Sequence, residues 1–125
     1  MGYTDLLYFG LSRSHFVNLK TRYGLHETTQ IHHLIPRQFR KHYTVRNLPI
    51  NDGCTLMLLP NRAGINRLST TRPVHEGGHV PYNRYVGEQL DLIGSFDAES
   101  HDAHVADLIR SLRWRVRCQS VPWLP

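Results

Sequence analysis

Two short segments carry the β-strand patterns of this chain, and their brevity limits the sheet that it can form. Residues 28–34 contain threonine and isoleucine and end at a pair of histidines. Residues 54–59 form a continuous apolar run, typical of a buried strand, which Pro60 ends. Because the other patterned segments are helical, we expect an α+β domain.

Helical patterns occupy about residues 12–23 and 98–118, and a third helix is expected from about His79 to Gly94. In this middle segment apolar residues recur at helical spacing and form one face. Gly94 is suited to end the helix, and Asp97 is the expected cap of the last one.

Length and composition indicate one globular domain, residues 1–125. Its two cysteines are too few and too far apart for a disulfide framework or a cysteine-based zinc site. No apolar run approaches the ~20 residues of a membrane span, and the N-terminus lacks signal-peptide features, so we expect a soluble protein without a membrane partner. Residues 60–78 are expected to be mostly loop, and Trp114 and Trp123 to belong to the core.

The net charge of +5 is unevenly distributed along the chain. Between Leu34 and Val74 there are seven arginines or lysines against one acid, a net charge of +6. Residues 75–100 contain five acids against one arginine, a net charge of −4. Such asymmetry suggests a face that attracts a polyanion, although an arginine-rich solvated surface would give the same composition.

Histidines lie at both ends of the basic segment. His32 and His33 end the first predicted strand, where a twist and a following turn can bring both side chains toward one pocket. His75 and His79 have a spacing that lets two imidazoles hold one metal ion. The two glycines between them permit a tight bend just before the expected helix. Each motif alone is weak, because histidine pairs are often incidental or locally hydrogen-bonded.

Together, these motifs resemble the AHH-type branch of the HNH/endonuclease VII superfamily, the His-Me finger nucleases. The resemblance covers about residues 29–95 and depends on His32-His33-Leu-Ile-Pro, the apolar strand with Pro60, and His75-x-Gly-Gly-His79-x-x-Tyr82. It implies a ββα-metal finger, in which a short two-stranded hairpin and a helix are embedded in additional helices.

The resemblance also implies roles for individual residues. His33 would be the general base that activates water, and His32 and His79 would be metal ligands, with His75 a possible third. Two asparagines are open candidates for the HNH asparagine that binds or orients the metal site, namely Asn61 and Asn83. Four basic residues are expected to hold flanking phosphates: Arg37, Arg40, Lys41 and Arg62.

The implied activity is endonucleolytic hydrolysis of nucleic acid with low sequence specificity and one divalent metal ion, Mg²⁺, Mn²⁺, Zn²⁺ or Ni²⁺. DNA is the expected substrate in preference to RNA. Family members are often toxin domains neutralised by an acidic immunity protein, so the chain could act in the cytoplasm or be a delivered toxin domain. The alternatives are a non-catalytic zinc-stabilised nucleic-acid-binding domain and a basic protein-interaction module with incidental histidines.

Overall fold

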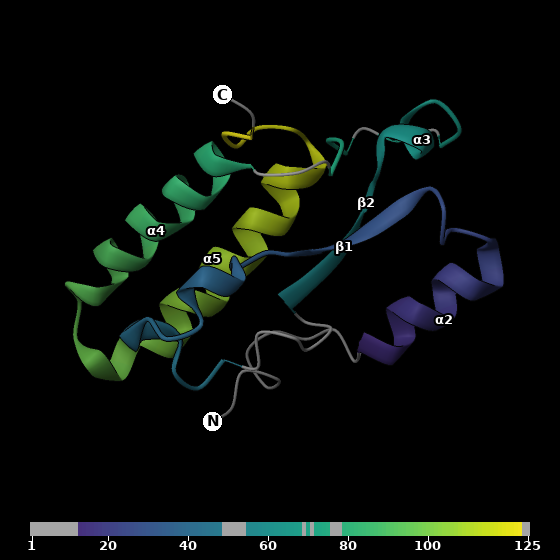
Figure 1. Cartoon of the computed structure of the whole chain (residues 1–125). Coiled ribbons are helices and arrows are strands. Elements are labelled where there is room, and N and C mark those ends of the chain that lie inside the picture. The colour runs from purple at the N-terminus through teal and green to yellow at the C-terminus, as the bar shows by residue number, and fades with distance from the viewer. Residues whose placement is uncertain (1–12, 49–54, 69, 71, 76–78, 124–125) are drawn as a thin grey trace.

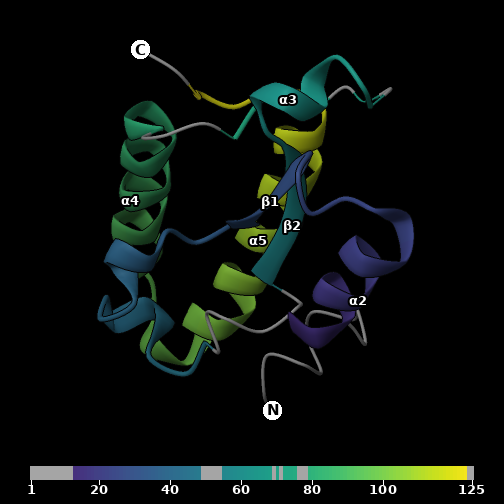
Figure 2. The ribbon, with the colours of Figure 1, turned by 45° about the vertical axis from the view of Figure 1, so that its right-hand side comes forward.

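A short β-hairpin lies between one helix and a pair of helices (Figure 1). The computed structural model describes residues 13–48, 55–68, 70, 72–75 and 79–123. Helix α2 (Arg13–Tyr23) lies on one side of the hairpin, and α4 (Val80–Gly94) and α5 (His101–Arg117) lie toward the other (Figures 1 and 2). The α+β class is confirmed.

The hairpin pairs β1 (Thr29–His33) with β2 (Leu56–Pro60) in antiparallel register. His32 lies opposite Met57 and His33 opposite Leu56. The strands follow the two predicted segments, as expected, although Pro60 is the last strand residue rather than the first residue beyond it. The expected start of the second strand at Cys54 and the turn before it lie outside the described residues.

The hydrophobic core lies between the hairpin and the pair α4 and α5. From the hairpin side, the core contains Met57 and Leu59 of β2 and Leu34, the residue that follows β1. The two helices contribute the apolar stripes visible in the sequence, with these buried members: Tyr82, Val86, Leu90, Ile93, Val105, Leu108, Ile109, Leu112 and Val116. Among the helices in the described part of the chain, none is long and apolar enough to cross a bilayer.

Most of the described residues of 60–78 form loop or turns, as expected, and they include the short helix α3 (Arg62–Ile65), whose N-terminus the Asn61 side chain caps by accepting a hydrogen bond from the Gly64 amide. One local expectation needs correction. Asp97 precedes a 3-10 turn (Ala98–Ser100) instead of capping α5 with its side chain.

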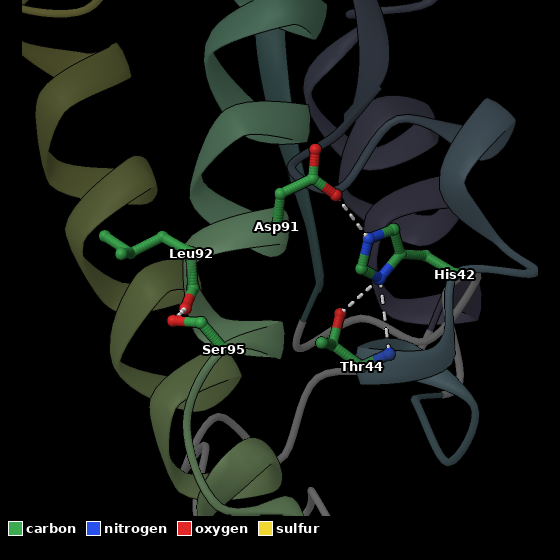
Figure 3. Close-up of polar contacts among 5 residues, drawn as sticks. All are labelled: His42, Thr44, Asp91, Leu92 and Ser95. Carbon is green, nitrogen blue, oxygen red and sulfur yellow. Dashed lines mark hydrogen bonds and ion pairs between the residues drawn. The ribbon is translucent and has the colours of Figure 1, made fainter.

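His42 joins the segment after β1 to helix α4 (Figure 3). Its Nδ1 accepts from the Thr44 amide at 3.2 Å and from the Thr44 hydroxyl at 2.7 Å. Its Nε2–H therefore donates to Asp91 Oδ1, at 3.0 Å. Near the end of α4 the Ser95 hydroxyl donates to the Leu92 carbonyl (Figure 3). The contacts of His42 with Thr44 and Asp91 hold the 3-10 turn Tyr43–Val45 against α4, the helix that begins after His79.

We expect His42→Ala to lower the free energy of unfolding by about 1–2 kcal/mol, because it removes a helix cap. Urea denaturation of the variant and the wild type measures the difference. Asp91→Ala is the matched control: since Asp91 is 77% exposed, we expect it to cost below about 1 kcal/mol. Equal losses in the two variants would show that the link to Asp91, and not the cap, carries the effect.

Candidate metal centre and nucleic-acid site

Three histidines from separate segments meet beside the N-terminus of α4. His32 lies on β1, His75 follows the basic segment, and His79 is the N-cap residue of α4. One ring nitrogen from each lies within 4.8 Å of the others. The ring centroids are 5.1 to 5.2 Å apart. Such a cluster has the chemistry of a transition-metal site, because neutral imidazole is a common ligand of zinc, nickel and related ions.

His32 is the buried member of this cluster, with 1% of its surface exposed. Neither of its ring nitrogens has a hydrogen-bond partner among the described residues. Burial and the neighbouring histidines hold the pKa of His32 well below its usual value of 6.5. Its imidazole is therefore neutral, which is the form that binds a metal. A buried polar side chain without a partner is costly, so these nitrogens fit a bound cation.

Amide side chains fix the tautomers of the other two histidines. Gln30 Oε1 lies 2.7 Å from His75 Nδ1, and Asn83 Oδ1 lies 2.9 Å from His79 Nδ1. Since an amide oxygen can only accept, each Nδ1 carries the proton and each Nε2 is left as a lone-pair donor. Burial, with the charge of His79 and His33, lowers the pKa of His75 to about 4.

A cavity of about 290 Å³ opens at this cluster. His33 is half-buried and lines it, together with the exposed Arg37 of the 3-10 turn Arg37–Phe39. Gln38 also lines the cavity and accepts a hydrogen bond from Asn83 Nδ2 at 3.3 Å. The structure thus places His33 beside the histidine cluster in one cavity, although the two histidines of the pair are adjacent on a strand.

The structure separates the other predicted site residues. Asn83 lines the cavity, whereas the Asn61 amide nitrogen donates to the Glu27 carbonyl and its oxygen caps α3. Arg40 and Lys41 are exposed on the turn that follows Arg37 and do not line the cavity. Arg62 begins α3, beyond the end of β2 that lies farthest from His33.

Trp123 and Tyr82 enclose the histidine cluster. The Trp123 ring centroid lies 5.1 Å from that of His32 and 4.8 Å from that of His79. Its indole nitrogen donates to the carbonyl of Val74, the residue before His75, at 2.9 Å. Tyr82 is fully buried beneath His32, with ring centroids 5.0 Å apart. The expectation that Trp123 is an ordinary core residue missed this contact, which no local sequence signal indicates.

A family model described as a nuclease family of the HNH/ENDO VII superfamily with conserved AHH matches residues 14–113. The chain belongs to the AHH nuclease family. In this AHH nuclease the histidine pair of β1 is preceded by Ile31, where the description of the family has alanine. Comparisons with curated proteins and with solved structures found no match.

Membership in the AHH nuclease family confirms the resemblance noted in the sequence and agrees with the hairpin and helix described above. The match includes both strands, the histidine cluster and most of α5. It ends before Trp123, so the residue that encloses the cluster lies outside the matched segment.

Proposed function

We propose that this AHH nuclease is a divalent-metal-dependent endonuclease that hydrolyses phosphodiester bonds with low sequence specificity. The observation that carries the proposal is the cavity in which His33 and Arg37 lie beside the three clustered histidines. Nucleic acid is the substrate class, with DNA favoured over RNA. Contacts to phosphates position a strand without reading its bases, which agrees with low specificity.

His32, His75 and His79 would hold the metal ion. Three imidazole ligands suit Zn²⁺, Ni²⁺ or Mn²⁺ better than Mg²⁺, which prefers carboxylates and water. When bound, a divalent ion supplies positive charge that stabilises the phosphate oxygens and the leaving oxygen. Gln30 and Asn83 orient two of the ligands, because their amide oxygens hold the Nδ1 protons.

His33 would act as the general base. A neutral imidazole within reach of a water molecule can accept its proton. The water oxygen attacks phosphorus, its proton passes to His33, and the ester bond to the leaving oxygen breaks. The Arg37 guanidinium, at the rim of the same cavity, would bind a phosphate oxygen and hold the strand in place.

A zinc-stabilised, non-catalytic nucleic-acid-binding domain is the second candidate, because a structural ion would also satisfy the buried nitrogens of His32. Structural zinc sites usually have four protein ligands, whereas catalytic sites leave a position open. Among the described residues the cluster has three members and borders an open cavity. This arrangement favours catalysis.

A role as a toxin domain belongs to the same proposal. The segment with a net charge of +6 would attract an acidic inhibitor or immunity protein as well as nucleic acid. An inhibitor that covers the cavity would compete directly with the substrate, and this distinguishes it from a partner that binds elsewhere.

A cleavage panel tests the proposed function. After dialysis against chelator, the protein is incubated with plasmid DNA, single-stranded DNA or RNA and with Mg²⁺, Mn²⁺, Zn²⁺ or Ni²⁺. We expect cleavage with at least one ion, its loss with excess chelator, and its return when that ion is restored. A protein that cleaves nothing, but unfolds when the metal is removed, would instead be the zinc-stabilised binding domain.

A further inference from the structure

Helix α5 carries three arginines and one tryptophan along one side, where Arg113 is half-buried and the other three are exposed. We call Arg110, Arg113, Trp114 and Arg117 the arginine–tryptophan face; their spacing of i, i+3, i+4 and i+7 places them along one side of the helix. They surround a shallow cavity of about 210 Å³. Trp114 is 62% exposed. Tryptophan is mostly buried in soluble proteins, so an exposed indole among cations suggests a ligand surface.

The charge of this face is predominantly positive. Asp107 forms an ion pair with Arg110 at 2.6 Å. The three arginines of the face together with this one acid carry a net positive charge. The half-buried Arg72 has its pKa lowered by burial and by the charge of Arg117. Arg117 thus repels a second cation, and a polyanion bound here would relieve that repulsion.

The face adjoins the outer edge of β2, the strand that pairs with the strand of the proposed base. Arg113 Nη1 donates to the Leu56 carbonyl at 3.0 Å, and Arg72 Nη1 donates to the Leu58 carbonyl at 2.6 Å. The Thr55 carbonyl accepts a hydrogen bond from the Leu34 amide, which follows β1. Because successive carbonyls of a strand point to opposite sides, the carbonyls of Leu56 and Leu58 point away from β1. Leu56 pairs with His33, so a single strand, β2, separates the strand of His33 from the edge that Arg113 contacts.

We propose that the arginine–tryptophan face binds an unpaired stretch of the nucleic-acid strand beyond the scissile phosphate, and this inference rests on the proposed nuclease function. The indole of Trp114 would stack on a base, while the guanidinium groups of Arg110 and Arg117 contact phosphates on either side. An exposed aromatic ring flanked by cations is the surface that single-stranded nucleic acid recognises without sequence preference. An acidic protein would pair with the arginines, whereas a nucleic-acid strand supplies both the phosphates for the arginines and the flat base that stacks on the indole.

The test is binding of fluorescein-labelled single-stranded oligothymidine in chelator, followed by anisotropy, with the integrity of the oligonucleotide checked on a gel. We expect Trp114→Ala to weaken binding by about 5- to 100-fold and Trp114→Phe to restore most of it. Arg117→Ala is expected to reduce the slope of log affinity against log salt by about 0.7. Tyr23→Ala is the matched control, because Tyr23 is also 62% exposed and Arg22 lies 5.5 Å from its ring centroid.

Several outcomes would overturn the inference. They are unchanged affinity in Trp114→Ala, an equal loss in Tyr23→Ala, or self-association that disappears with Trp114→Ala in size-exclusion chromatography. If the wild type cleaves but Trp114→Ala binds normally, the face is not a substrate site and the nuclease proposal stands. If Trp114→Ala loses binding but the wild type never cleaves, the nuclease proposal fails and the face remains a nucleic-acid contact.

Discussion

Replacement of His33 by alanine is expected to slow cleavage by about 10²- to 10⁴-fold, the usual contribution of a general base. His33 lines the same cavity as the histidine cluster but is not one of the three side chains whose ring nitrogens converge. The variant should therefore lose proton abstraction from water while the metal site stays intact. Slower cleavage with unchanged metal affinity distinguishes a general base from a metal ligand.

Single-turnover cleavage rates with the most active metal measure the first effect, and isothermal titration calorimetry with the same metal measures the second. His26→Ala is the matched control, because His26 is exposed and its ring contacts Thr21, away from the cavity. A His33→Ala variant that cleaves within two-fold of the wild type would exclude this residue as the base. Loss of metal affinity in the same variant would identify His33 as a ligand instead.

The hairpin and the two packed helices were predictable because their signals are local. A short apolar run bounded by Pro60 predicts a buried strand, and apolar residues at helical spacing predict the buried faces of α4 and α5. The expectation that Trp114 belongs to the core is wrong, because this residue is 62% exposed. Trp114 lies outside the stripe through Leu108, Leu112 and Val116, so its position on the helix already indicates exposure.

Parts of the site were not predictable from local patterns. The choice between Asn61 and Asn83 depends on what each side chain contacts. Asn61 bonds to Gly64 and Glu27, whereas Asn83 bonds to His79 in the cavity. The contact between Trp123 and the histidines joins segments that are far apart in the sequence, so it depends on how the chain returns after α5. Gln30 is different: it lies two residues before His32 on a strand, and period-two alternation would have placed both on one face.

Replacement of His32 by leucine is expected to abolish stabilisation by metal without destabilising the metal-free fold. The wild type should gain about 2.7 kcal/mol of unfolding free energy when free Zn²⁺ or Ni²⁺ is at 100 times its dissociation constant. In the variant, two imidazoles remain and that gain should largely disappear. The metal-free variant should be as stable as the wild type or about 1–2 kcal/mol more stable, because leucine removes two buried nitrogens that have no partner among the described residues.

Guanidinium denaturation in chelator and in excess metal measures both effects of His32→Leu. The exposed His26→Leu variant should keep the full metal-induced gain, and His33→Ala should also keep it while losing cleavage. Persistence of the gain in His32→Leu would place the metal elsewhere. A strongly destabilised metal-free His32→Leu protein would show that the buried imidazole stabilises the fold itself. Retained metal-free stability combined with lost metal stabilisation would identify His32 as a residue kept for the metal, since the fold gains nothing from burying it.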